Sequence, residues 1–352
     1  MPFIPYDRPS LRPTVKNSYQ QKMKASQKLF AVAPMMDWTD RHCRFFHRVL
    51  TKRALLYSEM IVADAILHGD RDHLLGGSDQ LSHVALQLGG SDPDKLAKAA
   101  SIGVTYGYEE INLNVGCPSD RVKSGTFGAC LMREPVLVSE CVRAMKDSIS
   151  VPVTVKCRIG VDDQDPGPAL DALSDEVWNA GCDGLWVHAR KAWLEGLSPK
   201  QNRDIPPLDY QRVYRLKSQN PARFVGINGG IDQLDQCRQH LLQVDGVMIG
   251  RSAYQRPALL RQVDQQIFGS DQPVISYPEI CQVMCEYAEQ HLRSGGRLHQ
   301  ITRHMSGLFH GLSGARKYRQ ILAMEATGAG AGPEILARAF EAVDFQIIEN
   351  AA

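Results

Sequence analysis

The chain has 352 residues, of which 43% are hydrophobic and 22% are charged, and its formal net charge is +1. These values predict a globular protein with one large domain and a smaller one. They exclude a highly charged chain, so any nucleic-acid surface has to be local. No apolar run approaches the roughly 18 residues of a membrane helix. The odd number of cysteines makes disulfides unexpected, and we therefore expect a cytoplasmic protein.

Residues 1–28 contain six lysines or arginines and one acid, Asp7, and they lack the apolar core of a secretory signal. We expect a flexible basic arm in this range. A transit peptide is the alternative.

Eight apolar or β-branched runs follow between residues 29 and 270. Helix-start signals lie between them: Asp92 precedes Pro93, Glu134 precedes Pro135, and Asp232 follows a glycine pair. This alternation predicts a parallel sheet, and eight units favour a (β/α)8 TIM barrel over an open doubly wound sheet. The predicted strands are Phe30–Met35, Leu55–Ile61, His83–Leu88, Glu110–Gly116, Val151–Ile159, Gly184–Arg190, Arg223–Gly229 and Gly246–Ser252.

The pattern changes after residue 270. Pro273 and Pro278 mark a break, and the remaining chain is helical in character without β-rich runs. We therefore expect a barrel over 29–270 and a small all-α domain over 271–352.

Candidate site residues collect where the predicted strands end. Active sites of such barrels lie at the C-terminal ends of the strands. The residues of interest there are Pro34, Met35, Met36, Gln87, Asn114, Cys117, Lys156, His188, Asn228, Gly229, Gly230, Gly250 and Arg251.

The glycines after the seventh and eighth strands predict a phosphate site. Gly229, Gly230 and Gly250 let backbone amides approach an anion, and Arg251 could add a charge-assisted contact. The loops after these two strands frequently bind phosphate in barrels. The alternative is that the glycines only end their strands.

Lys156 lies within an apolar strand, where a charge is tolerated only with a partner. An electron-rich ring that gains negative charge on reduction would be suitable, and a structural salt bridge to another strand is the alternative. His188 is a weaker candidate, because a histidine after a strand is often only a hydrogen-bonded core residue.

Cys117 lies in a Gly-Cys-Pro turn just past the fourth strand, where we expect it to face the cavity. Thiols ionise near pH ~8.5, so a thiol can deliver a proton at neutral pH. Cys130 is expected to be a packing residue. The nine cysteines include no C-x-x-C pair, and we expect no metal site.

The tail contains a basic tract. No acid occurs between Glu289 and Glu325, which is typical of a local phosphate-binding surface, although a solvated helix face is the alternative. Its basic residues are Arg293, Arg297, Arg303, Arg316, Lys317 and Arg319, with His291, His299, His304 and His310 as further donors.

Several segments resemble the tRNA-dihydrouridine synthases. Residues 33–40 (APMMDWTD) resemble their first-strand motif, and residues 112–119 (NLNVGCPS) resemble their catalytic-loop motif. Residues 188–200 (HARKAWLEGLSPK) and 307–312 (GLFHGL) are similar to the branch that modifies uridines 20 and 20a of the D-loop. The resemblance runs from about residue 28 to residue 330.

The resemblance implies noncovalent FMN, NADPH as reductant and tRNA as substrate, with no obligatory protein partner. Pro34 to Met36, Gln87, Lys156 and His188 would contact the flavin, and Asn228 to Gly230 with Gly250 and Arg251 would hold its phosphate end. Reduced FMN would give a hydride to C6 of uridine while Cys117 protonates C5. The expected tRNA contacts are Asn114, Ser198, Lys200, Arg203, Arg316, Lys317 and Arg319.

Two other functions remain open. A small-molecule FMN oxidoreductase of the dihydroorotate dehydrogenase type would share the barrel but would not need the basic tail. A non-catalytic RNA-binding protein would not need Cys117, Lys156 and His188. The sequence does not distinguish uridine 20 from uridine 20a, and it does not give the oligomeric state.

Overall fold

The computed structural model describes residues 29–77, 81–119 and 127–345. The arm predicted for residues 1–28 lies outside the described residues. Within them, no helix is long and apolar enough to cross a membrane.

Eight parallel strands close into a barrel in sequence order. Closure is made by β1 and β8, whose residues pair from Leu29 with Gly246 to Val32 with Ile249, and this pairing rules out the open sheet. All eight predicted strands are confirmed. The strands are β1 Leu29–Val32, β2 Leu55–Val62, β3 Val84–Gly89, β4 Glu110–Val115, β5 Val153–Arg158, β6 Gly184–His188, β7 Val225–Asn228 and β8 Gly246–Ile249.

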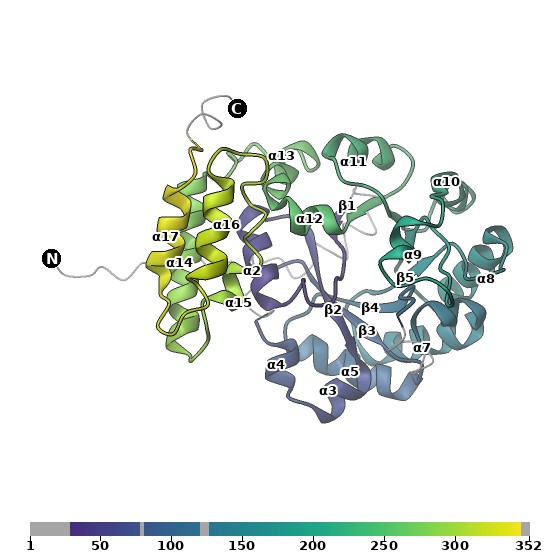
Figure 1. Ribbon diagram of the computed structural model, residues 1–352. Helices are drawn as coiled ribbons and strands as arrows, with labels where there is room; N and C mark the ends of the chain where they lie inside the picture. Colours follow the sequence, from purple (N-terminus) through teal and green to yellow (C-terminus); the bar gives the residue numbers. More distant parts are fainter. Residues whose placement is uncertain (1–28, 78–80, 120–126, 346–352) are drawn as a thin grey trace.

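Helices surround the barrel (Figure 1). The Asp92 carboxylate accepts a hydrogen bond from the Lys95 N–H at 3.0 Å, which starts α5 as predicted. The elements between and after the strands are α2 Arg41–Leu50, α3 Ala63–His68, α4 Arg71–Leu75, α5 Pro93–Thr105, η1 Gly128–Arg133, α7 Pro135–Ser148, α8 Pro166–Asn179, α9 Gln201–Asp204, α10 Tyr210–Gln219, α11 Leu234–Leu241, α12 Arg251–Gln255, η2 Pro257–Gln262 and α13 Val263–Gln266.

The barrel interior is divided into an apolar side and a polar side. Alternate residues of β1 and β2, with Ala85, Trp186, Phe224 and Met248, form a buried apolar cluster that is separate from the larger core. The opposite side, on β3, β4 and β5, carries the fully buried polar residues Gln87, Asn112 and Thr154. The strands therefore present a polar wall below the C-terminal edge of the barrel.

Trp186 fills the interior beside a glycine in each of two strands, Gly226 in β7 and Gly246 in β8. A Cβ atom added at Gly226 would lie 2.2 Å from the indole ring, and one added at Gly246 would lie 2.7 Å from it. The ring is fully buried and packs edge-on against Phe224, with ring centroids 5.2 Å apart. Two glycines thus make room for one large side chain.

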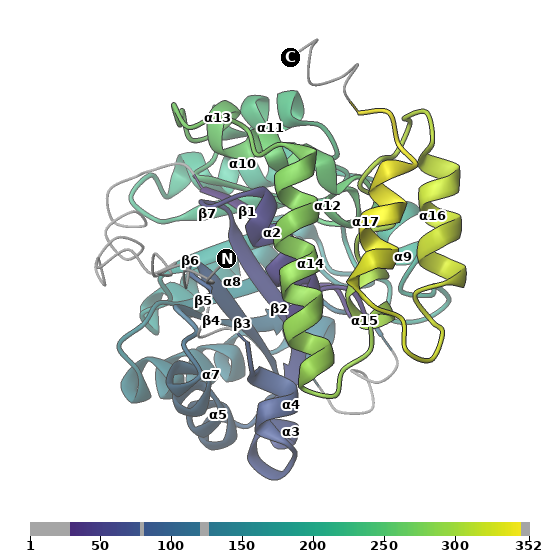
Figure 2. The same ribbon diagram turned by 90° about the vertical axis from the view of Figure 1, so that its left-hand side faces the viewer.

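The chain ends in a helical region, as predicted. Its helices are α14 Tyr277–Arg293, α15 His299–Thr302, α16 Ala315–Met324 and α17 Pro333–Glu341. Ser276 and Glu279 form a capping box that starts α14 at Tyr277. Figure 2 shows α14 alongside α2, where the Phe45 and Tyr287 rings stack with centroids 3.7 Å apart.

Candidate active site

The predicted site residues lie at one edge of the barrel. Gln87, Asn114, Lys156, His188 and Asn228 lie near or at the C-terminal ends of five different strands. Pro34 to Met36 follow β1, Gly229 and Gly230 follow β7, and Gly250 with Arg251 follows β8. Because parallel strands all end on the same side, closure of the barrel brings these positions around one opening.

Cys117 lies two residues past the end of β4. The Asn114 side-chain oxygen accepts hydrogen bonds from the N–H of Gly116 at 3.1 Å and of Cys117 at 2.9 Å. The Cys117 thiol is half-buried and donates to the Ser119 hydroxyl at 3.4 Å. Both sides of the Cys117 backbone are fixed, because its carbonyl accepts from the Ala129 N–H at 2.9 Å.

Arg158 organises the loop that contains Cys117, a role that its position in the strand did not reveal. Its guanidinium donates to the carbonyl oxygens of Gly116 at 3.1 Å, Lys191 at 3.0 Å and Asn202 at 2.9 Å. Burial is the main cause that lowers the pKa of Arg158 to about 10, so it stays charged at neutral pH. It therefore ties the Cys117 loop to the segment after β6.

Lys156 is a cation without an acid beside it among the described residues. Burial and, second, the charge of Arg158 lower its pKa to about 8. The salt bridge considered as an alternative is not found in the described part of the chain. Lys156 is the register partner of Asn114, which places it on the strand next to the Cys117 loop.

His188 is buried and uncharged. Burial, followed by the charges of Arg158 and Lys156, lowers its pKa well below the ordinary value. Its Nε2 atom is buried and has no hydrogen-bond partner in the described structure. A buried polar atom without a partner is costly, and a ligand that supplies one would remove that cost.

Two glycines after β7 adopt a backbone conformation that other residues rarely adopt. Gly229 has φ 114° and Gly230 has φ 70°. A Cβ atom at Gly229 would lie 2.6 Å from the His188 ring, so glycine is needed for space as well. Asn228, just before them, donates from its side chain to the Met248 carbonyl at 2.8 Å and joins β7 to β8.

Arg251, at the start of α12, already has a partner. Its guanidinium lies 2.7 Å from the Asp204 carboxylate, and both side chains are partly exposed. Asp204 belongs to α9, close to Arg203. If Arg251 contacts a phosphate as predicted, it does so while paired with Asp204, which was not among the predicted site residues.

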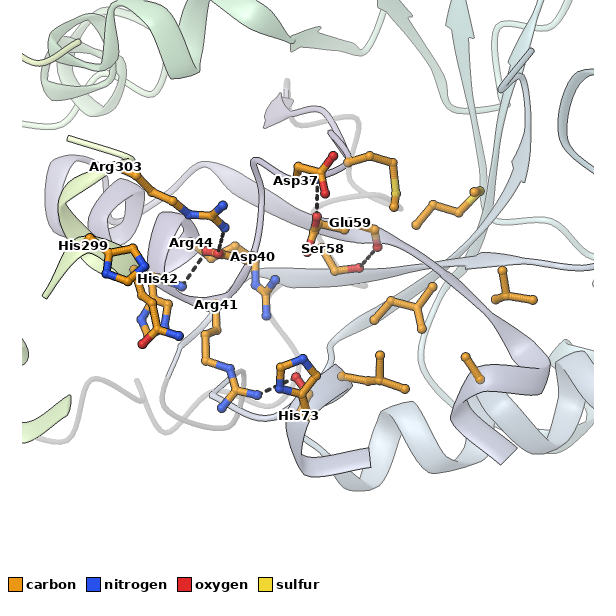
Figure 3. A pocket seen from close by; sticks show the side chains of 17 residues that line it. Asp37, Asp40, Arg41, His42, Arg44, Ser58, Glu59, His73, His299 and Arg303 are labelled. Atoms are coloured by element: carbon orange, nitrogen blue, oxygen red, sulfur yellow. Dashed lines mark hydrogen bonds and ion pairs between the residues drawn. The ribbon is translucent and has the colours of Figure 1, made fainter. Parts of the chain in front are cut away.

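A cavity of about 580 Å³ lies beside Met36, between the barrel and the helical region (Figure 3). It is lined by residues from the loop after β1, from β2, from α4 and from α15. The labelled polar residues around it are Asp37, Asp40, Arg41, His42, Arg44, Ser58, Glu59, His73, His299 and Arg303.

Three acidic residues line this cavity, Asp37, Asp40 and Glu59, and none of them was predicted as a site residue. The register of β2 shifts between Tyr57 and Met60, and the Glu59 carboxylate accepts a hydrogen bond from the Asp37 N–H at 2.5 Å. Asp37 has φ 63°, a left-handed conformation. Burial raises the pKa of Glu59. Glu59 lies within this register shift, which no sequence signal marks.

Asp40 joins the barrel to the helical region. It caps α2 by accepting from the N–H groups of His42 and Cys43, both at 2.9 Å. The same carboxylate lies 2.5 Å from Arg303 and 3.0 Å from His304. Burial alone would raise its pKa, but His304, the Cys43 N–H and Arg303 outweigh burial and hold the pKa well below the ordinary value.

The residues of the basic tract differ in whether they are paired within the protein. Arg303 and the fully buried His304 turn toward Asp40, and Arg293 pairs with Glu289 at 2.6 Å. These residues are therefore already engaged within the protein. The exposed tract residues on α16 are Arg316, Lys317 and Arg319.

The other predicted tRNA contacts lie on different elements. Ser198, Lys200 and Arg203 are exposed in and beside α9. Asn114 is buried, and both ends of its amide have protein partners. Its contact with tRNA stays a prediction.

The residues fit a flavin better than a metal ion. Among the described residues, no three His, Cys, Asp or Glu side chains are grouped so that they could hold a metal ion. The barrel edge instead offers a cation without an acid at Lys156, an unpartnered buried nitrogen at His188, and a glycine pair with Arg251 at β7 and β8. These groups suit a ring that gains electrons and carries a phosphate.

Comparison with known families gives a match over residues 31–344 to dihydrouridine synthase (Dus). A tRNA-dihydrouridine(20/20a) synthase of Shewanella oneidensis is 53% identical over 325 residues, covering 92% of this chain and 97% of the relative. A protein of the same name from Synechocystis is 55% identical over 315 residues, covering 90% of this chain and 94% of the relative.

Among solved structures, a 2-naphthoyl-CoA reductase in complex with 2-naphthoyl-CoA is similar with a TM-score of 0.51 and 12% sequence identity. The similarity covers 67% of this chain and 50% of the reductase, so this chain spans about half of that protein. At this identity the likeness concerns the fold alone.

Proposed function

The chain belongs to the dihydrouridine synthase family, whose members reduce uridine to dihydrouridine, and we propose that it acts on uridines 20 and 20a in the D-loop of tRNA with FMN and NADPH. The name shared by the listed relatives supports the two positions. We further propose that the enzyme works in the cytoplasm.

The observation that carries this proposal is the grouping of Cys117, Lys156 and His188 at one barrel edge. When bound, FMN would accept a hydride from NADPH and supply one to C6 of uridine. Lys156, still protonated near pH 7, would stabilise negative charge on the ring. His188, held neutral by burial, would meet the ring with its free Nε2.

Cys117 would be the proton donor to C5 of uridine. Its backbone is fixed by Asn114 on one side and by Ala129 on the other, so the thiol is held in place while a substrate approaches. The phosphate end of the cofactor would lie against Asn228, Gly229, Gly230, Gly250 and Arg251. Pro34 to Met36 and Gln87 would line its ring.

The helical region would bind the tRNA. Residues 271–352 would form this part and residues 29–270 the catalytic barrel. Three exposed cations of α16 supply a local surface for phosphates. A uridine must leave its stack to reach a barrel opening, and RNA loops allow this more easily than helices do.

The small-molecule alternative is less favoured, because relatives that match nearly the whole chain are named for tRNA. The non-catalytic alternative would not explain the cation without an acid and the unpartnered histidine at the same barrel edge as Cys117.

Two experiments test the proposal. Flavin released from the purified, denatured protein should be FMN, and release of FAD or of no flavin would contradict it. Mapping dihydrouridine in tRNA from a strain without the protein should show its loss at positions 20 and 20a. Unchanged dihydrouridine at both positions would exclude the proposed substrate.

A further inference from the structure

We propose that Glu110, buried at the base of the barrel, is a positioning residue that orients the Cys117 loop through a directed chain of side-chain hydrogen bonds. Glu110 is the first residue of β4, and its side chain is fully buried. The inference rests on the proposed role of Cys117 as proton donor.

The hydrogen-bond chain begins at the Glu110 carboxylate, to which two hydroxyls donate. Tyr57 from β2 and Thr154 from β5 both donate to Oε1 of Glu110, Thr154 at 2.5 Å. Burial, and then the charge of Glu110, raises the pKa of Tyr57 well above its ordinary value, so Tyr57 keeps the proton that it donates. The carboxylate therefore fixes the direction of both hydroxyls.

The middle of the chain crosses three neighbouring strands at one level. Gln87 is the register partner of Asn112, and Asn112 is the register partner of Thr154. The Asn112 amide nitrogen donates to the Thr154 hydroxyl at 2.8 Å, and the Gln87 amide nitrogen donates to the Asn112 oxygen at 2.9 Å. All three side chains are buried.

The chain ends at the backbone of the Cys117 loop. The Asn114 amide nitrogen donates to the Gln87 oxygen at 2.8 Å. The Asn114 oxygen is then the atom that faces the loop, where it accepts from the N–H groups of Gly116 and Cys117. Five side chains thus connect the barrel base to the residue proposed to deliver the proton.

Both ends of the hydrogen-bond chain require the same order of donors and acceptors along it. The Thr154 hydroxyl has one hydrogen, which it donates to Glu110, so its oxygen is left to accept from Asn112. Backbone N–H groups only donate, so the Asn114 oxygen must face Cys117. Each amide between them therefore has one favoured orientation. Reversing any of them would place two donors or two acceptors together.

Burying this network of polar side chains is energetically unfavourable unless every polar group in it has a hydrogen-bond partner. Burying a carboxylate and three amides inside a barrel requires that each be paired, whereas apolar side chains fill the other side of the same interior. A fully satisfied polar network specifies one arrangement more strictly than apolar packing does.

The test interrupts the hydrogen-bond chain at Thr154, away from the barrel opening. Thr154→Val removes the hydroxyl with little change in volume, and Thr154→Ser keeps it. We expect Thr154→Val to slow reoxidation of the reduced enzyme by tRNA by about 10–100-fold, because the thiol is misplaced. Flavin reduction by NADPH should stay within about threefold of wild type, since that step does not use Cys117. Thr154→Ser should restore most of the lost rate.

A second readout follows Cys117 itself. The rate at which iodoacetamide alkylates Cys117, measured on its peptide by mass spectrometry across pH 6–9, should change in Thr154→Val and not in Thr154→Ser. A merely structural role for Thr154 would lower the melting temperature and leave this profile and both half-reactions unchanged. That result would overturn the inference.

Cys117→Ala separates the inference from the proposed function. If Cys117→Ala reacts with tRNA at the wild-type rate, the proposed role of Cys117 fails. If Cys117→Ala is slow while Thr154→Val is normal in both readouts, only the role of the chain fails. Should Thr154→Val not fold, Thr154→Ala breaks the same link with a smaller side chain and carries the same expectation.

Discussion

The Asp40 carboxylate and the Arg303 guanidinium lie 2.5 Å apart and join the loop after β1 to the helical region, 263 residues further along the chain. His304 approaches the same carboxylate at 3.0 Å. The loop that contains Asp40 also carries Met36, which the flavin is proposed to contact. One acid therefore connects the proposed cofactor site with the helices proposed to bind tRNA.

Asp40→Asn should lower the free energy of unfolding at pH 7 by about 1–3 kcal/mol, because it removes a hydrogen-bonded charge from a partly buried cluster. The pKa of Asp40 is lowered by folding, so its stabilisation is complete above the ordinary value of 3.8 and is lost as the pH falls toward the folded value. The difference between wild type and variant, measured by denaturant unfolding, should shrink below about pH 4.

Asp92→Asn is the matched control for Asp40→Asn. Asp92 also caps a helix, but it is exposed and its carboxylate accepts from the Lys95 N–H. Asparagine is also a good cap, so this variant should change stability by less than about 0.5 kcal/mol. Equal effects of the two substitutions would show that the contacts with Arg303 and His304 add nothing.

Cys117→Ala should divide the reaction into two halves. Its flavin should be reduced by NADPH at a near-normal rate, while reoxidation by tRNA should slow by roughly 10²–10⁴-fold, as for a lost general acid. Cys130→Ala is the control, since the Cys130 thiol donates to the Phe127 carbonyl at 3.0 Å and has no proposed role in the reaction. Single-turnover modification by Cys117→Ala at the wild-type rate would move the proton donor elsewhere.

Lys156 should make flavin reduction depend on pH. Its pKa of about 8 means that the charge is present at pH 7 and is lost as the pH rises through 8. Stopped-flow reduction by NADPH should therefore slow between pH 7 and pH 9 in the wild type. Lys156→Met should be slower by about 10²-fold at pH 7 and lack this titration, whereas Lys156→Arg should keep a cation up to pH 9. A flat wild-type profile would contradict the assignment.

Replacing Arg316, Lys317 and Arg319 together by alanine should weaken tRNA binding and leave NADPH-driven reduction unchanged. Loss of up to three phosphate contacts should lower the slope of log affinity against log salt by about 2–3 units. The control replaces Lys98, Arg143 and Arg215, three exposed cations on α5, α7 and α10, and changes the net charge equally. If both triple variants bind tRNA alike, α16 is only a solvated face.

Local patterns predicted most of the fold. Each strand was found, but the first was expected to reach Met35 and the structure ends it at Val32, because apolar residues of the following loop extend the pattern. Helix starts were placed well where a capping side chain is present, as at Asp92. The helix expected to open at Asp232 begins at Leu234, since Gln233 provides the cap.

The site was only partly predictable, for physical reasons. Strand ends and glycine pairs can be recognised from the sequence alone, so the barrel edge around Cys117 and Lys156 could be located. Pairs such as Asp40 with Arg303 depend on tertiary distance, and Glu59 lies at a register shift of β2 that no sequence signal marks. Glu110 looks like the ordinary polar start of a strand, and the two side chains that donate to it, Tyr57 and Thr154, come from two other strands.

The indole of Trp186, which occupies the space above Gly226 and Gly246, has a consequence for how the chain can change over generations. Neither glycine can become alanine while the indole is present, because the new methyl group would overlap the ring. Replacing the indole with a smaller side chain while both glycines remain would leave a void. Substitutions at Trp186, Gly226 and Gly246, which are distant in the sequence, are therefore tolerated only when they occur together.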